Sequence, residues 1–375
     1  MAQGILGYLS SETRAFKDFG VNDVDLLVLS AAMYLEFERF EHYSRESAST
    51  PFSAAEDVGS FREYAEHDYH PADSEELLRL LAASPRFGSV PIERFSCAVE
   101  DEPPLQFGAA CFPINEECVV VAFRGTDMKL QGWLEDFEMT WREAAPGLVR
   151  AQRYLREAAA AYPRARLFVC GHSKGGSYAE YAALFASDEL AGRIERVCSF
   201  DGPSLFRVGG TADLDLEAYD LALLERYDEM ALPIARYVFA SSIGLLLERR
   251  DARELLDSAR FPFVKSIDPG RNHSVFAAGV EGGALALEPV SADALKAKMG
   301  SARFMRAFSG DERRFFTDAL AEACRASRVT LGITNEGSGH LAGALRAWYA
   351  SAPAEQRRQA RKLIAKAAIA GVASR

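Results

Sequence analysis

The sequence predicts an α/β protein with a mainly parallel sheet, helices on both faces of that sheet, and a helical extension at the C-terminus. Short apolar runs of strand type alternate with helical runs between about residues 94 and 270. This alternation is typical of parallel strands joined by crossover helices. One of these strands enters a helix through a glycine-flanked serine. From about Ser291 the strand signal ends and only helical periodicity remains.

Size and composition favour a soluble globular protein. The chain has 375 residues and 49% hydrophobic content, which suffices for one large core or one core plus a smaller helical appendage. The formal net charge is -11, which argues against nucleic acid as the main partner. No run approaches the roughly 20 apolar residues that cross a bilayer, and the N-terminus lacks the pattern of a secretory signal.

The cysteines predict reduced thiols and no metal site. None of them has the short paired spacing of a zinc site, and several lie in apolar, strand-like runs. The six are Cys97, Cys111, Cys118, Cys170, Cys198 and Cys324. We therefore expect a cytoplasmic protein whose thiols are buried, and no metal or organic cofactor.

The N-terminal part has helical spacing before the first core strands. Val24 to Phe40 predicts a helix after the capping-type Asn22 and Asp23. Residues 43–60 are rich in Ser, Ala and Glu and predict a surface loop. Ser74 to Ala83 predicts a helix capped by Asp73 or by Ser74 itself.

The first core strands are predicted at Phe95–Val99, Gln106–Phe112 and Cys118–Phe123. The first two are expected to be antiparallel and to lead into a central strand. Val119–Phe123 is apolar on both faces, as a strand covered on both sides should be. The polar turn 124–127 follows at the carboxyl end of that strand, where α/β folds place binding groups.

The remaining elements continue the alternation and then become helical. Strands are predicted at 167–170, 194–200, 236–240 and 262–267, and helices at 148–160, 177–186, 214–227, 292–308, 311–326, 340–349 and 354–370. We expect residues 1–290 to form the α/β domain with its N-terminal helical segment, and residues 291–375 to form the C-terminal helical extension.

The serine turn carries the main functional prediction. Gly171 and Gly175 let the strand and the helix approach closely, so that the Ser173 hydroxyl is exposed above the sheet. Amides at the start of the following helix point toward the same place and favour negative charge there. A strand–turn–helix context of this kind predicts Ser173 as a nucleophile.

A serine hydroxyl needs a base to take its proton, and the chain has only six histidines. His273 lies in a turn-rich loop after a late strand, where an α/β-hydrolase carries its base. His172 adjoins the serine and is expected to line the turn instead. The remaining histidines lie in or near polar loops or in the helical extension, and are His42, His67, His70 and His340.

The orienting acid is predicted as Asp201, which ends the strand after the serine helix and precedes Gly202 and Pro203. Asp268 and Asp251 are the alternatives. For the oxyanion hole, the amides of Lys174 and Thr126 are expected to approach from opposite sides, with the Thr126 hydroxyl as a further donor.

Some features leave two interpretations open. The Lys174 side chain either attracts an anionic group or is solvated or ion-paired, and Arg124 is a second cation beside the predicted site. Trp133, Phe137 and Trp141 have helical spacing, which fits packing or a mobile lid over an acyl pocket. The basic, amphipathic run from Gln356 to Ile369 either docks on its own acidic domain or touches an anionic membrane surface.

Four motifs together resemble the Mbeg1-like family, a lipase-like branch of the α/β-hydrolases that is more loosely related to class 3 lipases. They are Val121-Ala-Phe-Arg-Gly-Thr-Asp127, Gly132-Trp133 through Asp136-Phe137, Gly171-His-Ser-Lys-Gly-Gly176 and Ser199-Phe-Asp-Gly-Pro203. The resemblance covers roughly residues 20–325 and implies an α/β-hydrolase fold. It also implies an oxyanion role for Thr126, a lid near Trp133, and a role for Asp201 as the strand-end acid.

The sequence departs from the family pattern at two places. Ser204-Leu205 follow the Phe-Asp-Gly-Pro turn where the family tends to have glycine, and Ser274-Val-Phe-Ala replaces an acidic, tryptophan-containing pattern after His273. We predict a serine hydrolase that cleaves carboxylic esters of lipids or other acyl groups through a covalent acyl-enzyme. A peptidase or thioesterase would use the same residues, and a non-catalytic binding module on a hydrolase scaffold is the alternative.

Overall fold

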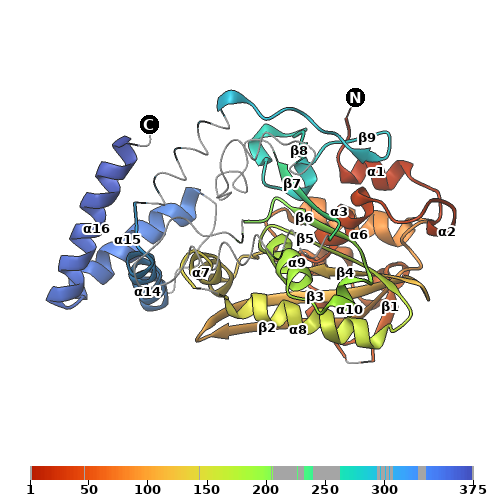
Figure 1. Cartoon of the computed structure of the whole chain (residues 1–375), viewed down its shortest axis with the longest axis horizontal. Helices are drawn as coiled ribbons and strands as arrows, with labels where there is room; N and C mark the ends of the chain where they lie inside the picture. The colour runs from red at the N-terminus through yellow and green to blue at the C-terminus, as the bar shows by residue number, and fades with distance from the viewer. Residues whose placement is uncertain are drawn as a thin grey trace.

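An eight-stranded sheet forms the centre of the molecule, and its strands follow one another in chain order from β1 to β8 (Figure 1). Pairing is antiparallel from β1 to β4 and parallel from β4 to β8. The strands are β1 (Ser49–Pro51), β2 (Pro91–Asp101), β3 (Pro104–Asn115), β4 (Cys118–Phe123), β5 (Arg166–His172), β6 (Ile194–Phe200), β7 (Ile234–Phe239) and β8 (Phe263–Val264). This is an α/β-hydrolase fold.

This computed structural model describes residues 2–45, 47–142, 144–203, 232–239, 262–293, 307–327 and 335–373, and the single residues 205, 226, 296, 300 and 304. The helices predicted at 214–227 and 292–308 and the alternative acid Asp251 lie wholly or mostly outside these residues. A two-stranded ribbon of β9 (Val280–Glu281) and β10 (Ala284–Leu285) completes the strands of the described part.

Alternating side chains of the central strands build a separate apolar core on each face of the sheet. On β4, Val120 and Ala122 enter one core while Val119, Val121 and Phe123 enter the other. All five are fully buried. The period-2 alternation of a strand therefore explains why this run is apolar throughout.

The two faces are covered by different helices (Figure 1). The first face carries α1 (Ile5–Ser11), α3 (Asp23–Ala32) and α6 (Pro71–Ala83), and the second carries α8 (Pro146–Ala161) and α9 (Lys174–Leu184). The short helices α2 (Phe16–Phe19), α4 (Glu41–Ser44), α5 (Ala55–Val58) and α10 (Asp188–Ala191) lie in the connections. Helix α7 (Leu130–Glu138) follows β4 and lies beside β3.

The sequence predicted the central strands well and the N-terminal segment less well. Helix α3 ends at Ala32 instead of Phe40, because a turn and a 3-10 segment at Phe37–Arg39 follow it. Residues 43–60 were expected to form a surface loop, but they contain α4, β1 and α5, and bury Tyr43, Phe52 and Ala55. That expectation was wrong because apolar residues interrupt the polar composition at wide spacing.

Helix α6 begins one turn earlier than predicted. Pro71 occupies its first turn and the preceding His70 makes no side-chain cap, so the expected caps Asp73 and Ser74 lie inside the helix. Proline fits this first position because its missing N–H would have no partner there. Helix α3 has the expected cap, since the Asn22 side chain accepts from the amides of Val24 and Asp25.

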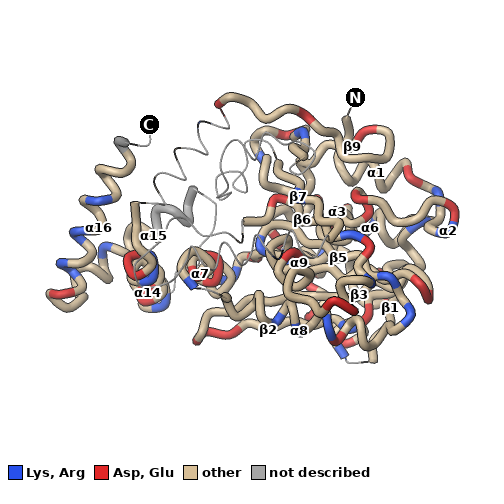
Figure 2. The backbone as a smooth tube through the Cα atoms, in the orientation of Figure 1, with Lys and Arg blue, Asp and Glu red and all other residues tan. Residues whose placement is uncertain are grey.

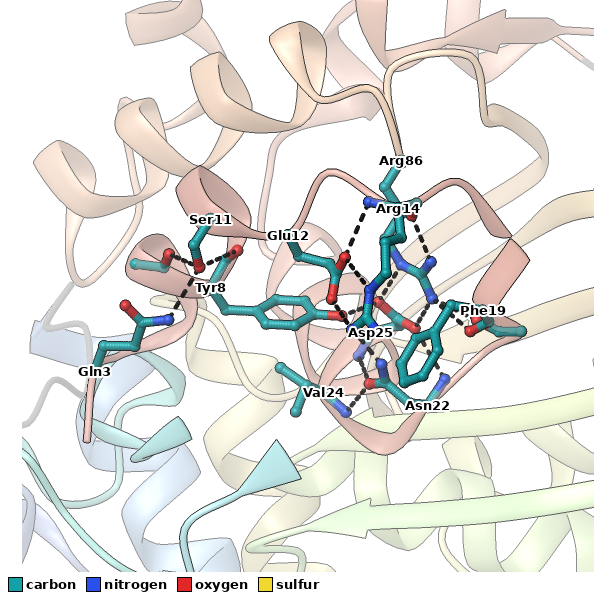
Figure 3. A network of polar contacts seen from close by, with 12 residues as sticks. Gln3, Tyr8, Ser11, Glu12, Arg14, Phe19, Asn22, Val24, Asp25 and Arg86 are labelled. Carbon is teal, nitrogen blue, oxygen red and sulfur yellow. Dashed lines mark hydrogen bonds and ion pairs between the residues drawn. The ribbon is translucent and has the colours of Figure 1, made fainter. Parts of the chain in front are cut away.

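A polar network anchors the N-terminal segment to the loop after α6 (Figure 3). The Arg86 guanidinium donates to both oxygens of Asp25, at 2.9 and 2.6 Å, and both side chains are fully buried. The Tyr8 hydroxyl donates to the same carboxylate at 2.8 Å. The guanidinium also donates to the main-chain oxygens of Arg14, at 2.8 Å, and Gly20, so one side chain holds three separate segments together.

The C-terminal helices are α14 (Gly310–Ser327), α15 (Asn335–Ser351) and α16 (Ala354–Ala373). They lie beyond α7, at the end of the molecule opposite α1 and α2 (Figure 1). A third apolar cluster joins α14 to α7 through the buried side chains of Leu134, Leu320 and Cys324, and Leu341 and Leu345 of α15 pack against it. No helix of the described part is both long enough and apolar enough to cross a membrane.

Candidate active site

Ser173 sits on a strained turn between β5 and α9. Its backbone has φ of 55° and ψ of −133°, a conformation that costs a non-glycine residue free energy and that is typical of functional turns. A Cβ atom on Gly171 would lie 2.2 Å from the Gly175 oxygen, and one on Gly175 would lie 2.3 Å from the Phe123 oxygen. Only glycine fits at these positions, which is why the elbow can form.

Three side chains from distant parts of the chain meet at this turn. His273 Nε2 lies 3.0 Å from Ser173 Oγ, and His273 Nδ1 lies 2.6 Å from Asp201 Oδ2. His273 lies between two 3-10 turns, Pro269–Arg271 and Val275–Ala277. Asp201 Oδ2 accepts a hydrogen bond from Nδ1–H of His273. The other ring nitrogen, Nε2, can therefore accept a hydrogen bond from the serine hydroxyl.

Asp201 is held at its main-chain amide and at its carboxylate. Its amide donates to the Tyr237 oxygen at 2.7 Å, and its Oδ1 accepts from the Phe239 amide at 3.0 Å. Its φ of 53° shows that the chain turns sharply where β6 ends. The side chain is fully buried, so its carboxylate faces His273 in a fixed orientation.

Two consecutive carboxylates on α7 contact Thr126 and Lys174, the two residues expected to supply the oxyanion amides. Asp136 Oδ2 accepts from Thr126 Oγ1 at 2.5 Å. Glu135 Oε2 lies 3.2 Å from Lys174 Nζ, and both of these side chains are fully buried. Sequence reasoning had placed Lys174 and Thr126 near the serine but had assigned no role to Glu135 or Asp136.

The Glu135 carboxylate is saturated by amides as well as by the lysine. Its Oε1 accepts from the Gly147 amide at 2.7 Å, and its Oε2 accepts from the Gln106 amide at 3.0 Å. The Lys174 ammonium also donates to the Gly132 oxygen at 3.2 Å. Of the two interpretations of Lys174, the structure shows the ion pair, and the lysine is buried instead of solvated.

Asp136 differs from its neighbour because no cation among the described residues pairs with it. Burial raises the pKa of the Asp136 carboxyl to about 6, and the nearby Lys174 ammonium opposes this shift. Its Oδ1 makes no hydrogen bond to any described residue. Near neutral pH the ionised carboxylate accepts a hydrogen bond from the Thr126 hydroxyl, which fixes the orientation of the Thr126 side chain.

Residues 81–322 match the family described as Mbeg1-like. This chain belongs to the Mbeg1-like family. No curated protein matches the sequence. Among solved structures, a mutant form of MDLA from Penicillium cyclopium is 17% identical, covers 72% of this chain and 87% of its own, and has a TM-score of 0.34.

Two other solved structures are similar to this Mbeg1-like chain. A fungal lipase–inhibitor complex, described as a model for interfacial activation in lipases, is 14% identical, covers 71% of this chain and 82% of its own, and has a TM-score of 0.30. M37 lipase is 16% identical, covers 67% of this chain and 76% of its own, and has a TM-score of 0.33. The sheet order and the strand–serine–helix turn carry the fold assignment.

The other candidate residues of the Mbeg1-like chain lie away from the serine. Asp268 accepts from the Gly270 amide within its own turn. His42 and His67 are exposed, as expected, whereas His70 is half-buried and its ring contacts that of Phe276. The His340 side chain lies outside the described side chains.

Arg124 is oriented away from the serine turn and into the N-terminal segment. Its guanidinium pairs with both oxygens of Glu38, at 2.7 Å each, and donates to the main-chain oxygens of Met33 and Leu35. It is almost fully buried. Arg124 therefore ties β4 to the segment after α3 and does not offer a free cation to a substrate.

The three aromatic residues of the predicted lid all contact other side chains. Trp133 Nε1 donates to the Tyr69 hydroxyl at 3.1 Å, and Trp141 Nε1 donates to Thr317 Oγ1 at 3.2 Å. The Phe137 ring makes an edge contact with Phe316, with 5.7 Å between centroids. Two of the three thus bind α14, and these are the contacts that the packing interpretation expects.

The remaining functional signals concern metals and membranes. Within the described ranges, no group of three or more His, Cys, Asp or Glu side chains has the arrangement of a metal site. Basic residues lie along helix α16 (Figure 2), and its Ile364 and Ile369 side chains are exposed. Lys366 binds Glu312 of α14, so part of the basic face is docked on the chain itself.

Proposed function

We propose that this protein is a serine hydrolase that cleaves carboxylic esters. The observation that carries the proposal is the continuous hydrogen-bonded series Ser173–His273–Asp201, with separations of 3.0 and 2.6 Å. These three residues follow different strands and share no local sequence motif. A strained nucleophile turn, a base within hydrogen-bond reach and a buried orienting acid together favour acyl transfer over a purely structural role.

In the proposed reaction, Ser173 Oγ attacks the ester carbonyl carbon while His273 Nε2 accepts its proton. The electron pair of the carbon–oxygen double bond moves to the carbonyl oxygen, which becomes an oxyanion. When the tetrahedral intermediate collapses, the bond to the alcohol breaks and His273 returns the proton to that leaving group. Water then repeats the sequence on the acyl-serine, releasing the acid and restoring the serine hydroxyl. Asp201 keeps the His273 Nδ1 proton in place and stabilises the imidazolium throughout.

We further propose that the amides of Lys174 and Thr126 bind the oxyanion. Two such donors from separate segments stabilise developing charge without reorganising, and each contributes about 100- to 1000-fold in rate. Glu135 would hold Lys174 through the lysine ammonium group, and Asp136 would hold Thr126 through the threonine hydroxyl. Helix α7 would thus be a fixed support for the oxyanion hole, and we do not propose it as a lid.

The proposed substrate is a lipid ester or another acyl ester. We place the protein in the cytoplasm because all six cysteines are free, four of them buried, as reduced core thiols would be. Residues 291–375 would be a helical extension of a hydrolase domain formed by residues 1–290. Peripheral contact of the basic helix α16 with an anionic membrane is part of the same proposal.

A fluorophosphonate probe tests the proposed nucleophile. We expect the folded protein to be labelled at Ser173 and the variant Ser173→Ala to be unlabelled. Ser177→Ala is the matched control, because the Ser177 hydroxyl lies one turn along α9 and donates to the Pro203 oxygen, at 2.7 Å. Labelling of this control should persist. Folded wild-type protein that resists the probe would favour the alternative, a binding module on a hydrolase scaffold.

A panel of p-nitrophenyl esters of increasing acyl length tests the substrate class. A lipid esterase should hydrolyse medium or long chains faster than acetate, because burial of each methylene contributes about 0.8 kcal/mol of binding. Turnover that is negligible at every length would argue against a lipid substrate even if Ser173 is labelled.

A further inference from the structure

The imidazole of His172 connects three segments around the proposed catalytic residues. His172 is the last residue of β5 and immediately precedes Ser173. Its Nε2 lies 2.8 Å from the main-chain oxygen of His273, and its Nδ1 lies 2.8 Å from the hydroxyl of Tyr34, in the turn after α3. The residue is only 5% exposed. Neither contact involves the Ser173–His273–Asp201 side chains themselves.

The two contacts together define the protonation of this ring. A main-chain carbonyl oxygen only accepts, so Nε2 must carry the proton. Burial, followed by the neighbouring His273, holds the pKa of His172 well below its usual range, so the ring is neutral. Its Nδ1 is therefore an acceptor, and the Tyr34 hydroxyl donates to it. The pKa of Tyr34 is raised by burial, so this hydroxyl keeps its proton.

The groups that face this ring come from several elements. The His273 ring lies 5.0 Å away between centroids, and the Phe239 ring of β7 stacks on the His172 ring at 5.8 Å. His70, which precedes α6, adds a weaker repulsion toward a protonated ring. The Asp201 carboxylate is engaged with His273 Nδ1. No carboxylate among the described residues hydrogen-bonds His172 to favour its charged form.

We propose that His172 is a positioning residue for the base, and that the hydrogen bond from Tyr34 to its Nδ1 favours the neutral ring in which it works. This inference rests on the proposed function and explains how the proposed base, His273, is held in place. Asp201 anchors the His273 side chain, whereas His172 anchors the His273 main chain. Because His172 and Ser173 are consecutive, the same strand end fixes the nucleophile and the backbone of its base.

The neutral state of His172 is also required for the proposed reaction. His273 becomes an imidazolium when it takes the serine proton. A second positive charge 5.0 Å away would disfavour that state. The Tyr34 hydroxyl occupies the only site at which the His172 ring would accept a further proton, and so opposes that charge.

The kinetic test uses His172→Phe, which keeps an aromatic ring but loses both hydrogen bonds, and His172→Gln, whose amide nitrogen retains a donor. For p-nitrophenyl butyrate we expect His172→Phe to lower kcat by about 10- to 100-fold with KM changed less than 2-fold, since small misplacements of reacting groups have effects of this size. His172→Gln should recover at least part of this loss. Equal losses in both variants with equal losses of Tm would overturn the proposal, as would unchanged kcat in His172→Phe.

The pH profile tests the role of Tyr34. In Tyr34→Phe, His172 Nδ1 loses its donor, so the ring gains a proton more readily and kcat/KM should fall at a higher pH on the acid side. The double variant Tyr34→Phe/His172→Gln has no ring to protonate and should lack this shift. An acid limb of Tyr34→Phe that overlays the wild-type limb would contradict the proposed role of Tyr34 in keeping the His172 ring neutral.

A measurement without turnover separates this inference from the proposed function. Nitrogen NMR of the histidine rings in the wild-type protein should show His172 as the neutral tautomer protonated at Nε2. The low-field proton of His273 Nδ1–H bound to Asp201 should be present in wild type, lost or broadened in His172→Phe, and retained in His172→Gln. Failure of the fluorophosphonate test alone would remove the catalytic role, whereas an unchanged low-field proton in His172→Phe would remove the positioning role.

Discussion

Two ion pairs of this protein, Arg86–Asp25 and Lys174–Glu135, are fully buried, and they differ in how their cations are held. Arg86 meets both oxygens of Asp25, at 2.9 and 2.6 Å, and adds main-chain oxygens of the N-terminal segment (Figure 3). Lys174 has two longer contacts of 3.2 Å, to Glu135 and Gly132. The planar fork of arginine fits a carboxylate in a way that a lysine ammonium does not.

The two ion pairs also lie in different parts of the molecule. Arg86 joins the segments on either side of α2 to α3, and it contacts none of the proposed catalytic groups. Lys174 immediately follows the proposed nucleophile and supplies one proposed oxyanion amide. Buried ion pairs contribute little net stability, because desolvation of both charges offsets their attraction. The comparison therefore suggests that the first pair specifies the local fold and the second positions a catalytic segment.

The largest expected effect comes from removing either cation. Arg86→Met and Lys174→Met should each lower the free energy of unfolding by about 3–5 kcal/mol, since each leaves a buried carboxylate unpaired. Only Lys174→Met should also lower kcat per folded molecule, by about 10-fold or more, because its amide loses its support. Urea unfolding and ester hydrolysis measure the two effects. If Arg86→Met lowers kcat as much, the two pairs do not differ in function.

A smaller effect is expected when both members of the pair at the site are neutralised. Lys174→Met/Glu135→Gln should be more stable than Lys174→Met alone, with an interaction energy of about 2 kcal/mol in a double-mutant cycle. Recovery of stability stays partial because Glu135 accepts hydrogen bonds from two main-chain amides. A glutamine side chain would present its NH₂ group, which cannot accept, to one of these amides. Additive losses in the cycle would show that the two side chains are not energetically coupled.

The smallest predicted effect concerns Asp136, the neighbouring carboxylate that pairs with no cation in the described part of the chain. Its pKa is raised from 3.8 to about 6 in the folded protein. The folded state therefore keeps a proton that the unfolded chain releases, so this group's contribution to stability falls as pH rises from about 4 to about 6 and is constant above that. Asp136→Asn removes the titration but keeps an oxygen acceptor for Thr126.

Relative to wild type, Asp136→Asn should therefore gain up to about 1.4 kcal/mol of stability between pH 5 and pH 8, the equivalent of one pKa unit. Urea midpoints at the two pH values measure this gain. A stability difference that is the same at both values would show that Asp136 does not titrate in this interval. Reduced kcat in the more stable variant would link its charge to the orientation of Thr126.

The sequence allowed the serine turn, the acid and the base to be proposed, because each follows a recognisable strand. Ser173 lies in a glycine-flanked turn, Asp201 ends the next strand, and elimination among six histidines left His273. The strands 118–123 and 194–200 were predicted at their observed limits. Local patterns were sufficient here because burial on both faces makes a strand apolar throughout.

The supports of the site were not predictable in the same way. Nothing in the local sequence indicates that Glu135 reaches Lys174, 39 positions away, or that Tyr34 reaches His172, 138 positions away. The N-terminal elements between residues 33 and 60 were also misjudged, because their apolar residues pack against distant strands and show no regular period. Composition alone therefore suggested a loop.

The order of residues by itself determined that this chain forms alternating strands and helices with a strained serine between them, because periodicity and glycine placement act over a few positions. Only the tertiary structure decided which groups surround that serine. Hydrogen bonds and buried charges depend on distances between segments that the sheet brings together, and those distances are set by the packing of the whole domain.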